Sequence, residues 1–131
     1  MSARRSRGRD GDGEHSWRIW VEHALVFVVR SGPSLIGAIL AFPCSNGEYC
    51  LHKVFIEPAW RGRGIGSRLF TALLAELDNR KTVCFLTVDP TNQPAITLYE
   101  KYGFTERQFV KGFYRETEDR YVLRRLAPVT R

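Results

Sequence analysis

The sequence predicts an α/β (α+β) domain built on one mixed, mostly antiparallel sheet, with a central parallel crossover and helices on both faces. Three observations support this prediction. Short apolar runs rich in β-branched residues indicate strands, two stretches with apolar residues at helical spacing indicate helices, and the elements follow the order strand, strand, strand, helix, strand, helix, strand, strand. The middle strand–helix–strand unit requires a parallel crossover, whereas the flanking strands are joined by short connections and pair antiparallel.

Three strands are predicted before the first helix. Ala24–Arg30 (ALVFVVR) is a continuous apolar run, typical of a buried strand. Leu35–Phe42 (LIGAILAF) follows a Ser-Gly-Pro-Ser turn, so the two runs are expected to form an antiparallel hairpin. Glu48–Ile56 (EYCLHKVFI) is the third strand and leads into a glycine-rich loop.

The second half of the chain contains both predicted helices. From Ser67 the apolar residues recur at helical spacing over about three turns, up to Leu77. A second helical face, from Ala95 to Tyr102, follows a turn and ends at Gly103, a residue that commonly terminates helices. The remaining strands are predicted at Val83–Val88, Arg107–Tyr114 and Arg120–Leu126.

Length and composition indicate one domain without a membrane span. A chain of 131 residues suits a single domain, which we assign to residues 16–131. Residues 1–15 are rich in arginine and glycine and lack an apolar pattern, which predicts a disordered basic tail. No apolar run approaches the roughly 18 residues that a membrane helix needs, and no secretory signal follows the basic start.

The cysteines indicate the redox compartment of the protein, and the net charge indicates which kinds of partner it can bind. Cys44, Cys50 and Cys84 lack metal-ligand spacing, so a reduced, cytoplasmic protein without a metal is expected. The net charge of +6 suits either a nucleic acid or an anionic cofactor. The arginine-rich start has no interleaved aromatic residues, which argues against nucleic-acid binding.

The loop Arg61–Gly66 (RGRGIG) is the clearest candidate binding site. Its three alternating glycines allow a sharp turn and a close approach of backbone N–H groups to a ligand. A helix begins directly after it, and its free N–H groups and dipole favour an anion. The dinucleotide pattern G-x-G-x-x-G and the P-loop pattern are both absent. The loop therefore predicts a pyrophosphate site, with a simple chain turn as the alternative.

Two motifs together resemble a known family. Val54-x-Ile56-x-Pro58-x-x-Arg61-x-x-Gly64-x-Gly66 resembles the acetyl-CoA-binding signature of the GNAT superfamily of N-acetyltransferases. Asn92-x-x-Ala95-x-x-Leu98-Tyr99-Glu100-Lys101-x-Gly103-Phe104 resembles the second motif of that superfamily. The resemblance covers roughly residues 24–126 and implies a transferase that moves an acetyl group from acetyl-CoA to a primary amine.

The resemblance also implies which residues bind acetyl-CoA. In the family, the strand before the loop splays away from its parallel neighbour, and the pantetheine arm lies in that gap. For Asn92 the resemblance implies one of two roles: it contacts the pantetheine or it orders the turn. The implied backbone contacts to pantetheine come from Val54, Phe55 and Ile56. The implied pyrophosphate amides come from Arg61, Gly62, Arg63, Gly64, Ile65, Gly66 and Ser67.

Acetyl transfer needs a proton donor for the departing thiolate and a base for the attacking amine. The resemblance places Tyr99 near the thioester sulfur, so Tyr99 is the candidate acid. His52 matches a histidine of arylalkylamine acetyltransferases and is the candidate base, because an imidazole titrates near neutral pH. Strand alternation predicts that Cys50, His52 and Val54 share one face.

Other assignments of the base stay open. Thr87 stands where related N-terminal acetyltransferases often carry a carboxylate or histidine, and threonine cannot serve as a base. Glu57 and Glu48 are weaker carboxylate candidates, and a water chain without any single base is a further alternative. His52 is as readily interpreted as a surface histidine.

The acceptor amine is predicted from the closing hairpin. The segment from Val110 to Arg120 resembles that of ribosomal-protein and N-terminal (alanine) acetyltransferases, and implies that Tyr114 helps to hold a peptide N-terminus. A small amine, such as a polyamine or an antibiotic, is the second interpretation, and a non-catalytic CoA-binding module is the third. Only 23 residues precede Ala24, so the N-terminal part is short for the family. We expect an open acceptor site, one completed by a second subunit of a homodimer, or none.

Overall fold

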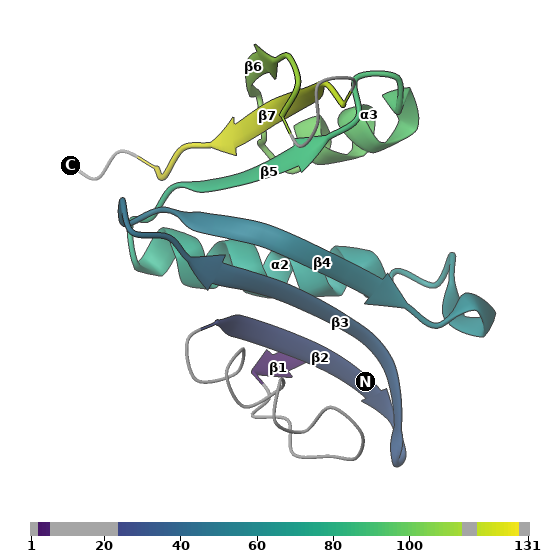
Figure 1. Ribbon diagram of the computed structural model, residues 1–131. Coiled ribbons are helices and arrows are strands. Elements are labelled where there is room, and N and C mark those ends of the chain that lie inside the picture. Colours follow the sequence, from purple (N-terminus) through teal and green to yellow (C-terminus); the bar gives the residue numbers. More distant parts are fainter. Residues whose placement is uncertain (1–2, 6–23, 114–117, 129–131) are drawn as a thin grey trace.

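The computed structural model describes residues 3–5, 24–113 and 118–128. A seven-stranded sheet runs through the molecule in the order β1-β2-β3-β4-β5-β7-β6 (Figure 1). The strands are β1 (Ala3–Arg5), β2 (Leu25–Ser31), β3 (Ser34–Pro43), β4 (Tyr49–Ile56), β5 (Cys84–Val88), β6 (Glu106–Val110) and β7 (Arg120–Arg125). The helices are the short 3-10 helix η1 (Pro58–Trp60), α2 (Ile65–Asn79) and α3 (Gln93–Lys101). Every predicted strand and helix is therefore present.

Strand pairing confirms the mixed, mostly antiparallel sheet. Strands β4 and β5 pair in parallel, and the other neighbouring strands of the described sheet pair antiparallel. Helix α2 connects the two parallel strands and so forms the central crossover. Figure 1 shows that α2 lies behind β3 and β4, across the middle of the molecule.

Strand β1 corrects part of the predicted tail. Residues 3–5 were expected in the disordered segment 1–15, but they pair antiparallel with β2, from Ala3 opposite Val29 to Arg5 opposite Phe27. Without β1, strand β2 would end the sheet with a row of unpaired backbone N–H and C=O groups. Composition reflects side chains and does not reveal such backbone pairing. The other residues of the predicted tail lie outside the described residues, and the domain boundary at residue 16 stays a prediction.

Both described helices pack on the same face of the sheet, so the prediction of helices on both faces is wrong for the described part of the chain. Side chains of α2 and α3 belong to one apolar cluster with the strands, and the rings of Phe70 and Tyr102 stack with centroids 4.3 Å apart. The opposite face carries a separate apolar cluster of β2 and β3 residues. Apolar strands predict that both faces are covered, but they do not specify which element covers each one.

A guanidinium joins the elements on the helix side. Arg125 of β7 donates two hydrogen bonds to the Asp78 carboxylate of α2, at 2.6 and 2.9 Å. Its Nε donates a third, at 3.2 Å, to the backbone oxygen of Tyr102 at the end of α3. Arg125 therefore ties the last strand to both helices, which places α3 beside the central crossover.

Candidate active site

The two parallel strands separate soon after they begin. Pairing of β4 with β5 is limited to Tyr49 opposite Cys84 and Cys50 opposite Phe85, and the Tyr49 N–H donates to the Val83 oxygen at 2.9 Å. Beyond this point the strands diverge toward their carboxyl ends (Figure 1). The predicted splay is confirmed, and the later residues of β4 have no backbone partner on the β5 side.

Hydrogen-bond alternation shows which groups of β4 face this gap. The Glu57 N–H donates to the Ile36 oxygen of the β3 side at 2.8 Å. Because successive residues of a strand direct their backbone groups to opposite edges, those of Phe55 also face β3, where Phe55 lies opposite Ala38. The groups of Val54 and Ile56 face the gap. Val54 and Ile56 therefore remain candidates for the predicted backbone contacts to pantetheine, whereas the predicted backbone contact from Phe55 conflicts with the pairing.

A β-bulge at His52 changes the side-chain pattern of β4. Leu40 and Ala41 are adjacent in β3, but their partners are Lys53 and Leu51, so His52 is the extra residue of the bulge. Such a residue leaves its backbone outside the regular ladder and shifts the alternation. The bulge places an irregular stretch of backbone beside the gap.

The bulge overturns the prediction that Cys50, His52 and Val54 share one face. Val54 packs against the helix-side cluster, because its position after the extra residue reverses the alternation. His52 lies on the opposite face, with its ring 5.4 Å from that of Phe42 in an edge contact, and Cys50 lies opposite Phe42 on the same face. Successive side chains alternate between the two faces of a sheet only where the strand is regular.

The glycine-rich loop adopts the backbone that its sequence predicts. Gly62 and Gly64 have φ angles of +80° and +79°, which favour glycine. A Cβ atom added at Gly66 would lie 3.1 Å from Ile56 Cδ1, so the loop also approaches β4 closely. The buried Ile65 side chain anchors the first residue of α2 in the core.

The start of α2 is open to an anion. Its N-cap residue, Gly64, provides no side-chain cap, and the first turn of this described helix contains no acidic residue. The first N–H groups of a helix have no intrahelical acceptor, and the dipole adds partial positive charge. Helix α3 differs, because the Asn92 side chain accepts from the Ala95 N–H at 3.2 Å. Of the two roles predicted for Asn92, this hydrogen bond supports the ordering of the turn.

Basic side chains surround these N–H groups. Arg61, Arg63 and Arg68 are exposed, and the ion pairs between described residues involve other arginines. The Arg63 guanidinium lies 5.0 Å from the centroid of the Trp60 ring, a cation–π distance that holds it beside the loop. Sequence reasoning missed Trp60 and Arg68, although one directly precedes the loop and the other lies in the first helical turn. The loop and its arginines fit a pyrophosphate.

Tyr99 combines a packed ring with a protonated hydroxyl. It extends from α3 between Phe70 and Phe104, with centroid distances of 6.2 Å to each ring. Burial raises the pKa of the Tyr99 hydroxyl, because the charged phenolate is poorly solvated there. The raised pKa keeps the hydroxyl protonated near neutral pH, which is compatible with the predicted role of Tyr99 as the acid.

Glu48, one of the two weaker base candidates, is already bonded and lies away from the open part of the gap. Glu48 pairs with Arg124, next to the closed end of the two parallel strands. Thr87 lies on β5 opposite Val122. Asp89, which sequence reasoning did not consider, follows β5 but accepts two 2.8 Å hydrogen bonds from Thr91, and these lower the pKa of its carboxyl. Tyr114, the predicted peptide contact, lies outside the described residues.

Comparison with known proteins shows the family of this chain. The model of the acetyltransferase (GNAT) family matches residues 3–104. The chain belongs to the GNAT family. Its first motif supplies the loop and the start of α2, and its second motif supplies α3 with Asn92 and Tyr99.

Individual GNAT relatives share the fold. The chain is 38% identical over 79 residues to the N-alpha-acetyltransferase RimI of Mycobacterium tuberculosis, an alignment that covers 60% of this chain and 49% of that protein. It is similar to the crystal structure of the ribosomal-protein-S18-alanine N-acetyltransferase from Escherichia coli, with a TM-score of 0.70, 24% identity, and coverage of 84% and 73%. It is also similar to a GNAT acetyltransferase from Elizabethkingia anophelis with acetyl-CoA bound, with a TM-score of 0.70, 15% identity, and coverage of 86% and 82%.

The alignments with curated relatives are partial. The chain spans about half or less of the length of the curated relatives it matches. Within the residues that the structure describes, no helix has the length and apolar character needed to cross a membrane. The same residues contain no group of three or more His, Cys, Asp or Glu side chains that could hold a metal ion.

Proposed function

We propose that this GNAT protein transfers an acetyl group from acetyl-CoA to a primary amine of a peptide or protein. One observation carries the proposal: the splay between β4 and β5 opens beside the uncapped N-terminus of α2. A cosubstrate with an amide-rich arm and a pyrophosphate needs backbone partners beside an anion site. The family match supports the transfer chemistry, and the RimI relative supports an α-amine acceptor.

The chain supplies the binding groups. Val54 and Ile56 present backbone N–H and C=O groups to the pantetheine amides in the gap. The amides from Arg61 to Ser67, with the guanidinium groups of Arg61 and Arg63, bind the pyrophosphate. This arrangement fixes the thioester against the attacking amine, and such positioning contributes a large share of the rate in a two-substrate reaction.

The chain also moves two protons. His52 removes a proton from the ammonium of the acceptor, directly or through water, so that the nitrogen can attack the thioester carbon. A backbone N–H near Val54, beside the bulge, stabilises the oxyanion. As the new C–N bond forms and the C–S bond breaks, Tyr99 donates its proton to the departing sulfur.

The test is acetyl transfer by the full chain to a panel of peptides with free N-termini, with polyamines and aminoglycosides as small-amine comparisons. We expect thiol release and an acetyl group on the peptide α-amine. His52→Ala should lower kcat/KM by about 10²-fold if His52 is the base. Acetylation of small amines alone would overturn the peptide assignment. Acetyl-CoA binding without transfer to any acceptor would overturn the enzymatic assignment.

A further inference from the structure

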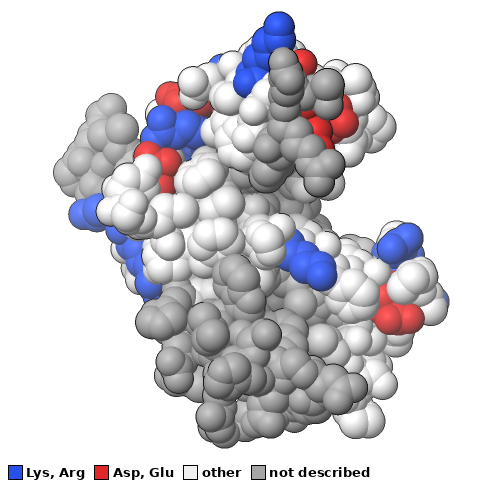
Figure 2. Space-filling view, in the orientation of Figure 1, with Lys and Arg blue, Asp and Glu red and all other residues white. Residues whose placement is uncertain are grey.

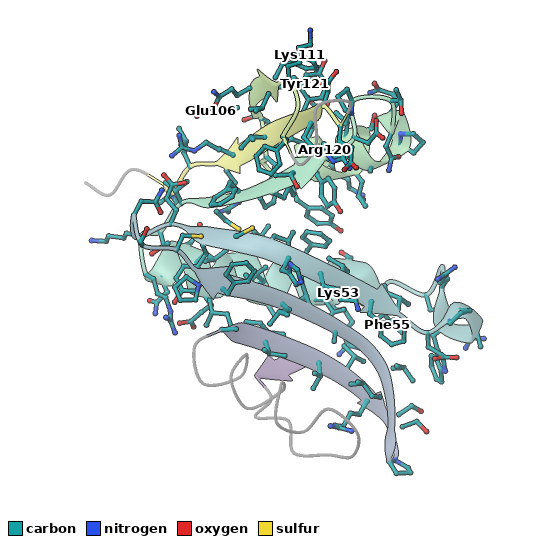
Figure 3. All side chains as sticks on the ribbon, in the orientation of Figure 1. Lys53, Phe55, Glu106, Lys111, Arg120 and Tyr121 are labelled. Carbon is teal, nitrogen blue, oxygen red and sulfur yellow. The ribbon has the colours of Figure 1, made fainter. Side chains whose placement is uncertain are left out.

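The face of β2, β3 and β4 opposite the helices contains an apolar groove of about 200 Å³. Its apolar lining comes from all three strands: Val26, Leu35, Ala38, Leu40 and Phe55. Leu35 and Phe55 each leave 38% of their surface exposed, although both are large apolar side chains. Figure 3 shows Phe55 and Lys53 on β4 on the side of the sheet that faces away from α2.

The charged side chains that the three strands place on this face are basic. Lys53 also lines the groove, and Arg30 lies on the same face because it is opposite Leu35 in the strand pairing. The three strands contain no Asp or Glu. Figure 2, in the same orientation as Figure 3, shows one basic side chain next to uncharged described residues near the centre of the view. The groove therefore suits a molecule with an apolar part and a negative charge.

The groove also adjoins the proposed reaction site. Lys53 and Phe55 flank Val54 in β4, and Val54 is one of the two residues whose backbone groups face the gap. Neighbouring Cα atoms lie about 3.8 Å apart, so a molecule in the groove is within a few ångströms of the β4 backbone. His52, the proposed base, lies on the same face as Lys53 and Phe55.

We infer that this groove binds the acceptor peptide, and that it selects an apolar first side chain followed by a carboxylate that pairs with Lys53. This inference rests on the proposed peptide acetylation and names its substrate class. The apolar lining removes the first side chain from water, while the Lys53 ammonium favours an acidic second residue over its neutral amide. A basic second residue meets the like charge of Lys53 and no carboxylate from these strands.

The experiment compares kcat/KM for matched peptides that begin with leucine and differ only at the second residue: aspartate, asparagine or lysine. The full-length wild-type chain should favour aspartate over asparagine by about fivefold, the upper end for one exposed ion pair. Lys53→Met should reduce this ratio to about one, and Lys53→Glu should make the lysine peptide the best of the three. Leu35→Ser should reduce the preference for a first leucine over a first alanine.

Ratios between peptides are taken within one protein preparation, so a partly unfolded variant does not change them. Lys101→Met is the matched control: Lys101 is an exposed cation on α3, on the helix side of the sheet, and its removal should leave the ratio at the wild-type value. Equal rates for the three peptides, or a ratio that Lys53→Glu does not change, would overturn the groove assignment alone. If no peptide is acetylated, the proposed function fails and this inference fails with it.

A different occupant of the groove would give a different result. If another part of this chain or a second copy fills it, the wild type will show no charge preference. Lys53→Glu will then change the melting temperature or the oligomeric state instead. That combination contradicts peptide binding in the groove.

Discussion

At the scale of single residues, Tyr99 is the side chain whose packing and chemistry can be separated most cleanly. Tyr99→Phe keeps the ring between Phe70 and Phe104 and removes only the hydroxyl. We expect kcat to fall by about 10²-fold, because the thiolate loses its proton donor. The KM for acetyl-CoA and the melting temperature should change little. Steady-state kinetics with thermal unfolding measures all three, and unchanged kcat would show that Tyr99 only packs.

Buried thiols give a stability prediction at high pH. Burial raises the pKa of Cys84 from 9.0 to about 12, with a smaller contribution from the neighbouring Cys50. Between these values the unfolded chain releases the proton and the folded chain keeps it, so the free energy of unfolding falls as pH rises. The effect of one such group is on the order of 1 kcal/mol per pH unit.

The measurement is guanidinium-induced unfolding of the wild type and of Cys84→Ala from pH 8 to pH 11. Other groups titrate in this range, so the informative quantity is the difference between the two slopes. We expect Cys84→Ala to be less stable near pH 8, because it leaves a cavity, but to lose stability more slowly above pH 9. Parallel curves would contradict the raised pKa of this thiol.

The sequence could identify Tyr99 and His52 only as candidates, and it failed on the side to which β4 residues point. Alternation is a property of a regular ladder, and the bulge at His52 depends on how β4 pairs with β3. Nothing within EYCLHKVFI marks that extra residue. The chemical type of a side chain is thus readable from the sequence, whereas its direction depends on the neighbouring strand.

At the scale of elements, the loop before α2 can be tested with two glycines of similar backbone. Gly64 has a φ of +79° and Gly32, in the β2–β3 turn, has a φ of +58°; an added Cβ would contact no other atom at either position. Gly64→Ala and Gly32→Ala should therefore destabilise the fold by comparable amounts, about 1 kcal/mol. Only Gly64→Ala should raise the KM for acetyl-CoA, because it distorts the N–H groups of the proposed pyrophosphate site.

Chemical unfolding and KM measurements on both variants decide this prediction. An equal rise in KM for Gly32→Ala would attribute the effect to general destabilisation, and an unchanged KM for Gly64→Ala would place the pyrophosphate elsewhere. The loop was the most predictable element, since glycine spacing and the following helix are both local features. The two helices also differ in their N-caps: Gly64 provides no side-chain cap to α2, whereas Asn92 caps α3. This difference follows from the local sequence.

At the scale of the whole molecule, the sheet consists of two parts that meet at a short parallel contact. Strands β1–β4 and β5–β7 pair through two residue positions of β4 and β5, so the gap that defines the site also weakens the sheet. Helix α2 packs against the first part, and the ring stack between Phe70 and Tyr102 links it to α3. The strand order along the chain predicted the crossover, but only long-range contacts decide that both helices cover one face.

Arg125 connects the two parts of the sheet, so substituting it tests how the gap between β4 and β5 is maintained. Its guanidinium bonds the Asp78 carboxylate and the Tyr102 oxygen, and its own side chain is largely buried while Asp78 is about one-third exposed. Arg125→Met keeps much of the side-chain volume but leaves Asp78 and the end of α3 without their partner. We expect a loss of about 2 kcal/mol in the free energy of unfolding, below the range for fully buried pairs because Asp78 can regain water.

Because α3 carries Tyr99, the same variant should also lower kcat for acetyl transfer more than it raises the KM for acetyl-CoA. Asp78→Asn is the matched variant, and a double-mutant cycle with Arg125→Met isolates the coupling between the two residues. Arg80→Met is the control, since Arg80, directly after α2, bonds Glu76 of α2 and Tyr49 of β4 and does not bridge the two parts of the sheet. A loss of stability with unchanged kcat would show that α3 is positioned by the Phe70–Tyr102 contact alone, and that the two parts of the sheet hold the gap without help from β7.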